Sequence, residues 1–214
     1  MTLPPGSTHT TERALLKAAR QLDHALSMRP REPGLLVLRA RAAARLDGPL
    51  ESARWWLQAA AAQDGDASAD SYREAALAYE AGGDVAAARR AWSDVLRVEP
   101  TATQKLVVAE FYARTQQIPA AVKLLAEVAK SSEHSEALDA CDRLFELDED
   151  PMPWARRAVE HAAKARRPDR FGASLVRLAH LHRDRGDERK AQAYLERARP
   201  YIEASDGPLA ASHG

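Results

Sequence analysis

Apolar residues recur along this chain at every third or fourth position, which is the period of one buried face of an α-helix. The stretch from Tyr72 to Pro100, YREAALAYEAGGDVAAARRAWSDVLRVEP, shows the pattern most clearly. Its apolar positions are Tyr72, Ala75, Ala76 and Tyr79 in the first half and Ala88, Trp92 and Val95 in the second. Gly83-Asp84 between the halves is typical of a turn, and Pro100 is typical of a helix end. The pattern predicts two helices packed together as a hairpin.

The hairpin pattern recurs at a nearly constant interval. If Ala88 marks where the second helix crosses the first, equivalent alanines occur at Ala18, Ala53, Ala121 and Ala191, separated by 35, 35, 33 and 70 residues. The supporting residues are Ala44, Gly48, Leu57 and Ala60 near Ala53, Val108, Ala109, Tyr112, Leu125 and Val128 near Ala121, and Leu175, Leu178, Ala179, Gly186, Leu195 and Ala198 near Ala191. The last gap equals two periods, so a degenerate repeat lies between Ala121 and Ala191.

The degenerate repeat has a weaker pattern than its neighbours. Its first helix is predicted to carry Leu138, Cys141, Leu144 and Phe145, and its second helix, which follows Pro151 and Pro153, is predicted to carry Trp154, Ala158 and Ala162. Proline marks the start of the second helix but does not fix which face is buried. The sequence leaves the register of this repeat open by about three residues.

These hairpins resemble the tetratricopeptide repeat, whose signature places large residues, a small residue and an aromatic on the first helix, then alanine, an aromatic and a closing proline on the second. Tyr72 stands where the motif has tryptophan, and Ala76 stands where it has glycine. The resemblance covers roughly residues 12–205. It implies an all-α, right-handed superhelical solenoid of antiparallel helix pairs, with about five repeats, one of them incomplete at the N terminus.

The two ends of the array differ from its middle. Residues 1–11 are predicted to be a flexible segment, 12–205 the repeat domain and 206–214 a flexible tail, with no long capping helix after Pro200. The helix over 12–28 resembles a second helix whose partner is missing. It is either a cap or a surface that meets another chain, so self-association through uncapped ends is one expectation.

Composition narrows the function classes. The formal net charge is +0, which disfavours wholesale binding to nucleic acid or to an anionic membrane. The sequence holds no 18-residue apolar run, and its first residues lack the pattern of a secretory leader, so a cytoplasmic location is predicted. The single cysteine, Cys141, falls on an apolar helical face and is predicted to be inert.

No catalytic, cofactor-binding or metal-binding group is predicted. His180 and His182 lie two apart on a helix and point about 200° apart, so they cannot share a metal ion, and His182 takes the packing place of Tyr79 and Tyr112. The acidic run from Glu146 to Asp150 lacks the glycine turn and distal glutamate of a calcium loop. Enzymatic activity is therefore not expected.

A binding groove is predicted along the successive first helices, because the small and aromatic positions are used in packing. The predicted groove residues are Arg39, Ala42, Arg45, Arg73, Leu77, Glu80, Glu110, Arg114, Arg177, His180 and Arg183. Their arginine bias suits a protein or peptide partner with acidic residues. The alternative is that arginine is simply abundant, at 25 against 6 lysines. Some members of the family bind a C-terminal carboxylate through lysine and asparagine. Leu38 and Ala42 stand at those places here, which disfavours that activity.

Trp55 and Trp56 are adjacent and cannot both face one helix seam. One interpretation is that the next repeat covers the outward-facing ring, and the other is that the pair anchors a partner. Trp92, in contrast, falls in register with the core.

The resemblance and the absence of catalytic groups favour a non-enzymatic adaptor or scaffold. Two alternatives stay open: a regulatory or sensor module that controls a partner enzyme or transcription factor, and an RNA-binding protein. The second would use the basic stretch that contains Arg156, Arg157, Arg166, Arg167 and Arg170.

Overall fold

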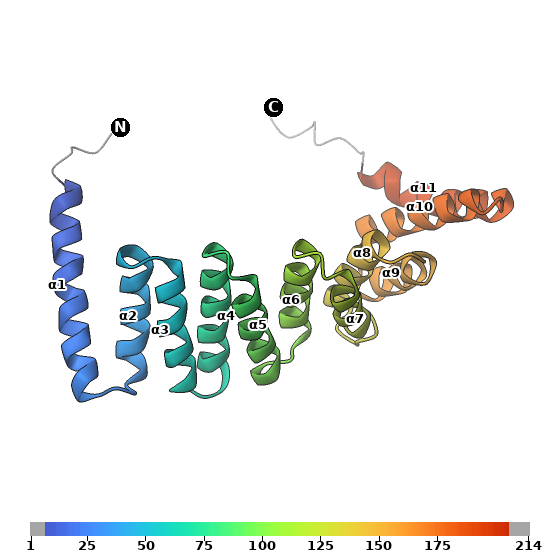
Figure 1. Ribbon diagram of the computed structural model, residues 1–214. Coiled ribbons are helices and arrows are strands. Elements are labelled where there is room, and N and C mark those ends of the chain that lie inside the picture. Colours follow the sequence, from blue (N-terminus) through green and yellow to red (C-terminus); the bar gives the residue numbers. More distant parts are fainter. Residues whose placement is uncertain (1–6, 206–214) are drawn as a thin grey trace, which may run out of the picture. The chain divides into compact units, whose positions relative to one another are not determined.

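The computed structural model describes residues 7–205, and helices are the only regular secondary structure in that range. The helices are α1 (Ser7–Met28), α2 (Pro33–Leu46), α3 (Pro49–Ala61), α4 (Gly65–Ala81), α5 (Val85–Val98), α6 (Ala102–Arg114), α7 (Ile118–Val128), α8 (His134–Leu147), α9 (Met152–Lys164), α10 (Pro168–Asp184) and α11 (Glu188–Ser205) (Figure 1). The predicted all-α fold is therefore confirmed. The segments predicted to be flexible fall largely on residues 1–6 and 206–214, which lie outside the described residues.

The helices form two compact units, one up to Thr101 and the other from Ala102 onward. In the first unit, each helix from α1 to α5 packs against the next one along the chain. In the second unit, α6 to α11 pack in the same sequential way, and α6 also contacts α8. Sequential packing of helix pairs is the arrangement of a helical solenoid, and α1 packs against α2 ahead of the α2–α3 pair.

Buried alanines mark the places where paired helices cross. Ala53, Ala88, Ala121 and Ala191 are fully buried in α3, α5, α7 and α11. Ala155 takes the same place in α9, since it lies 34 residues after Ala121 and 36 before Ala191 and is also buried. The degenerate repeat thus keeps the common register. In α1 the buried residue is Ala19 and Ala18 is exposed, so the predicted register of that helix is corrected by one residue.

The turn inside the 72–100 hairpin forms as predicted. Gly83 has φ +77°, a left-handed conformation that glycine adopts without strain. Asp84 then caps α5, where its side chain accepts a hydrogen bond of 2.9 Å from the backbone N–H of Ala87. Glycine and aspartate therefore set the angle at which the chain reverses.

The first helix starts earlier than the sequence predicts, and the last helix continues past a proline. α1 begins at Ser7, ahead of the predicted start at residue 12. α11 continues through Pro200 to Ser205, the last residue of the predicted repeat domain. The physical reason lies in Tyr201, whose ring packs edge-on against Phe171 with centroids 5.0 Å apart. A side chain at Gly172 would collide with Tyr201, so glycine permits this close approach. Tertiary packing thus overrides the helix-breaking tendency of proline.

Candidate functional site

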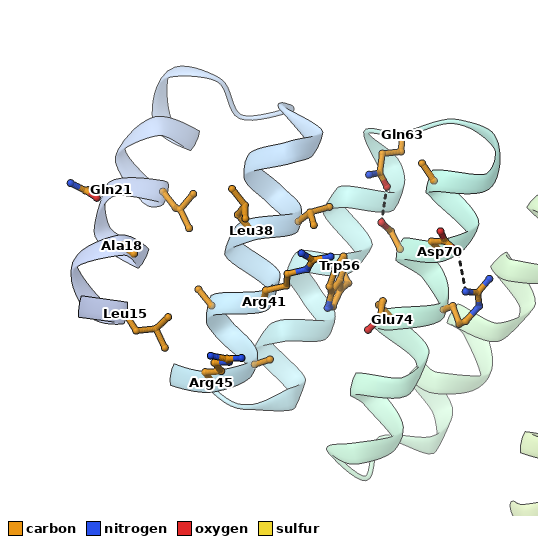
Figure 2. A pocket seen from close by; sticks show the side chains of 17 residues that line it. Leu15, Ala18, Gln21, Leu38, Arg41, Arg45, Trp56, Gln63, Asp70 and Glu74 are labelled. Atoms are coloured by element: carbon orange, nitrogen blue, oxygen red, sulfur yellow. Dashed lines mark hydrogen bonds and ion pairs between the residues drawn. The ribbon is translucent and has the colours of Figure 1, made fainter. Parts of the chain in front are cut away.

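A pocket of about 1040 Å³ opens in the first unit and is lined by residues of α1, α2 and α4 (Figure 2). Each of these helices contributes residues that recur with the helical period. They are Leu15, Ala18, Gln21 and Leu22 from α1, Leu38, Arg41, Ala42 and Arg45 from α2, and Ala67, Asp70, Ser71 and Glu74 from α4. The walls also include Val37 and Ala44 of α2, Arg73 of α4 and Gln63 of the α3–α4 connection. α3 adds Trp56. The pocket therefore lies along the first helices of two successive repeats.

The apolar part of the pocket comes mainly from α1 and from Trp56. Trp56 is only 8% exposed, and in Figure 2 it lies between Arg41 and Glu74. Leu15 and Leu22 are two turns apart on α1 and face the same space. Leu38 on α2 is 50% exposed, which is unusual for leucine beside such a surface. An apolar ligand would cover Leu38 at this place.

The charged part of the pocket has opposite signs on its two sides. Arg41 and Arg45 are exposed, lie one turn apart on α2, and form no ion pair with any described residue. On α4, Arg73 pairs with Asp70 at 2.9 Å, whereas Glu74 is exposed and unpaired among the described residues. The α2 wall is therefore cationic, and the α4 wall keeps one carboxylate that a ligand can reach.

Hydrogen bonds hold the upper edge of the pocket in shape. The side chains of Gln63 and Ser71 lie 2.6 Å apart, a hydrogen bond that joins the α3–α4 connection to α4 (Figure 2). The buried hydroxyl of Ser68 donates to the carbonyl of Ala60 at 2.9 Å. Because these contacts exist without a ligand, the pocket is preorganised at this edge.

Four of the predicted groove and anchor residues line the pocket: Ala42, Arg45, Arg73 and Trp56. Leu77, which is exposed, continues the face of α4 one turn beyond Arg73 and Glu74. Glu80 has a packing role instead, since its carboxylate accepts a 2.8 Å hydrogen bond from the indole N–H of Trp92. Arg41 and Glu74 were missed by the sequence prediction.

Arg39, predicted to face the groove, packs on another side of α2. Its side chain is 12% exposed and forms ion pairs with Asp23 at 2.6 Å and Asp47 at 2.8 Å. Its guanidinium lies 5.1 Å from the centre of the Trp55 ring. The Trp55 ring is therefore partly covered within the unit by Arg39.

The misplacement of Arg39 has a simple cause in the register of α2. The prediction took Ala44 as a core residue, but Ala44 is exposed and Ala43 is fully buried. One residue on a helix is a rotation of about 100°, so the shift turns Arg39 away from the pocket and turns Arg41 toward it. Leu36, Ala40 and Ala43 recur at helical spacing and are buried. With these residues taken as the buried face of α2, Arg41 is placed on the pocket side.

Five predicted groove residues lie in the second unit, where several are engaged with neighbours. Glu110 pairs with Arg143 at 3.4 Å, and Arg183 lies 3.6 Å from Glu188. Arg177 pairs with Asp142 and lies 5.1 Å from the centre of the Phe145 ring. The remaining two, Arg114 and His180, are exposed. Their role in binding stays a prediction.

The residues weighed for chemistry have packing partners. Burial raises the pKa of the Cys141 thiol to about 12, so at neutral pH it is a thiol rather than a reactive thiolate. His182 is buried and stacks on Tyr194 with centroids 5.4 Å apart, as predicted for a packed ring. In the acidic run, Asp148 accepts a hydrogen bond from Trp154 at 2.6 Å and Asp150 pairs with Arg185 at 2.9 Å.

The basic stretch is partly neutralised within the second unit. Arg167 pairs with Asp169 at 2.9 Å, and Arg170 pairs with Asp139 at 2.5 Å and also with Asp142.

Among residues 7–205, no three histidine, cysteine or acidic side chains gather as a metal site. No helix in that range is long and apolar enough to cross a membrane.

A histidine pair that the sequence did not reveal joins three helices of the second unit. The Nδ1 atoms of His134 on α8 and His161 on α9 lie 3.1 Å apart. Nε2 of His161 lies 3.1 Å from the carbonyl oxygen of Ala129 at the end of α7, so this nitrogen carries the proton that it donates. Nδ1 of neutral His161 then accepts a hydrogen bond from Nδ1–H of His134. A second proton on His161 would occupy this Nδ1 and break the hydrogen bond.

This geometry predicts acid sensitivity of the second unit. Burial lowers the pKa of His161, and the coulombic effects of His134, Lys164 and Arg157 lower it further, whereas the hydrogen bond that His161 donates to the carbonyl of Ala129 raises it. In the unfolded chain His161 has the ordinary histidine pKa of about 6.5 and takes up the second proton more readily than in the folded chain. The free energy of unfolding therefore decreases as the pH falls through about 6.5. We expect the melting temperature of the full chain to drop by about 2–5 °C more between pH 7.5 and 5.5 than that of His161→Gln, measured by circular dichroism. An equal drop in both proteins would contradict this role, and His180→Gln, at an exposed histidine, serves as the control.

Comparison with solved structures places this architecture among helical repeat proteins. The crystal structure of BtubC (BKLC) from P. vanneervenii is 14% identical, with 97% of this chain and 96% of that chain covered and a TM-score of 0.54. A putative kinesin light chain from Podospora anserina with nearly identical TPR-like repeats is 20% identical, with 84% and 99% covered and a TM-score of 0.51. YrrB, a TPR protein with an unusual peptide-binding site, is 11% identical, with 88% and 99% covered and a TM-score of 0.51.

These likenesses hold at the level of the fold. No family model matches the sequence, and no curated protein matches it. The sequence motifs, the sequential helix pairs and the solved structures agree that the chain has the fold of the tetratricopeptide-type solenoids.

Proposed function

We propose that this protein is a non-enzymatic adaptor that holds a segment of a partner protein in the pocket of its first unit. The observation that carries the proposal is the pocket itself, in which the half-exposed Leu38 and the Trp56 ring line a space of about 1040 Å³. That volume lies at the upper limit of pockets for small molecules, and its walls come from three helices. A protein segment fits such a space better than a metabolite does.

The solved neighbours are consistent with this proposal. One of them, YrrB, is described as having a peptide-binding site, and the surface along successive first helices is the concave side of a solenoid of this kind. The regulatory and RNA-binding alternatives stay predictions from the sequence, as does self-association through the ends of the array.

The proposal is tested by selecting a random displayed peptide library on the full chain and titrating the enriched peptide. Leu38→Asp places a charge in the apolar pocket, so we expect it to weaken binding about 10-fold or more, measured as Kd by fluorescence anisotropy. Val85→Asp makes the same kind of change at a similarly exposed residue that does not line the pocket, and its Kd should stay within about twofold of wild type. Equal Kd values for the two variants, or no enriched peptide, would contradict the proposal.

A further inference from the structure

The pocket has the length of a short helix. Its walls include Leu15–Leu22 of α1, Val37–Arg45 of α2 and Ala67–Glu74 of α4, which span seven or eight residue steps. Seven steps along a helix are about 10.5 Å, or about two turns. A partner helix of about two turns would therefore run the length of these walls.

The charges around the pocket define the edges of such a helix. Arg41 and Arg45 are four residues apart on α2, so their Cα atoms are separated by a rise of about 6 Å. Two carboxylates at positions i and i+4 of a bound helix have the same separation, and each could meet one guanidinium. Glu74 on the α4 wall lies on the opposite side and disfavours a third carboxylate there. Leu15 of α1 lies on the other side of α2 from Glu74, and Trp56 lies between Arg41 and Glu74 (Figure 2), so apolar residues of the bound helix would flank its carboxylates.

We infer that the pocket binds a two-turn amphipathic α-helical segment of a partner protein, with apolar residues against α1 and Trp56 and two carboxylates at i and i+4 against Arg41 and Arg45. This inference rests on the proposed function and adds the conformation and charge pattern of the partner. The two arginines supply recognition because they have no competing ion pair among the described residues. Their attraction for the carboxylates acts through partly solvated surroundings, so it weakens as salt screens it.

The experiment uses three synthetic 14-residue helical peptides with the same apolar stripe. They carry glutamate, glutamine or lysine at the two positions that face α2, and their Kd values are measured against the full chain at 50 and 500 mM NaCl. We expect the glutamate peptide to bind wild type about 10-fold more tightly than the glutamine peptide at low salt, with a smaller preference at high salt. On the Arg41→Glu/Arg45→Glu variant, the lysine peptide should become the tightest binder. A matched variant, Arg89→Glu/Arg90→Glu, makes the same charge change at exposed residues of α5 outside the pocket and should keep the wild-type order.

The outcomes separate this inference from the function on which it rests. Equal binding of the glutamate and glutamine peptides, with affinity lost in Leu38→Asp, would overturn the carboxylate pattern and leave the pocket as the binding site. A glutamate preference that survives Arg41→Glu/Arg45→Glu would also overturn it. If proline placed at the centre of the glutamate peptide leaves its Kd unchanged, the helical conformation is overturned, because proline breaks a helix.

Discussion

Replacing Trp92 with alanine is expected to lower the free energy of unfolding of the first unit by about 3–5 kcal/mol. Trp92 is 1% exposed in α5, and its indole N–H donates to Glu80 of α4. The change removes the largest fully buried side chain of that hairpin and leaves a cavity that rigid neighbours fill only in part. Since α4 also forms one wall of the pocket, peptide binding should weaken together with stability.

Urea unfolding followed by circular dichroism measures the Trp92→Ala effect, and hydrogen exchange locates it on α4 and α5. Trp92→Phe is the matched control, because it keeps an aromatic ring in the core but loses the hydrogen bond to Glu80. We expect it to cost about 1–2 kcal/mol. If Trp92→Ala changed stability by less than about 1 kcal/mol, the assignment of Trp92 as a core residue would be contradicted.

Enlarging Ala155 to leucine is expected to destabilise the second unit by about 1–3 kcal/mol. Ala155 is buried where α9 crosses its partner, and the three heavy atoms that leucine adds cannot be accommodated there without moving a helix backbone. The sequence did not single out this residue. It is identified only by the common place of the crossing alanines in α5, α7, α9 and α11.

Ala163→Leu is the control for Ala155→Leu because it makes the same substitution in the same helix at an exposed position. Alanine and leucine have similar helix propensities, so the control should change stability by less than about 0.5 kcal/mol. The two variants are compared by urea unfolding of the full chain. Equal effects would mean that Ala155 is not a crossing residue and that the degenerate repeat has another register.

The repeating hairpins could be predicted because their packing is local. Each small residue must recur once per repeat for two helices to approach closely, so the period is visible in the sequence at Ala53, Ala88, Ala121 and Ala191. The turn at Gly83 and the burial of Trp92 follow from the same local pattern. Contacts between distant residues were less predictable. The helix past Pro200 depends on Tyr201 meeting Phe171, 30 residues earlier, and no local signal marks that contact.

The pocket could be predicted only in part because it depends on the rotation of individual helices. Arg45, Arg73 and Trp56 were among the predicted residues, but an error of one residue in α2 exchanged Arg39 for Arg41. α2 is rich in alanine, so several registers give an apolar face of similar quality. Only the packing of α1 and α3 against α2 decides between Ala43 and Ala44 as the buried residue.

The central claim, that the first unit holds a partner helix between α1, α2 and α4, is tested most directly by amide chemical-shift mapping. The peptide selected on the full chain is added to the ¹⁵N-labelled protein, and shift changes are followed residue by residue. The account predicts that the largest changes cluster in residues 15–22, 38–45 and 67–74 and include the indole N–H of Trp56. Changes confined to the second unit, or to exposed residues of α5 such as Arg89 and Arg90, would contradict it.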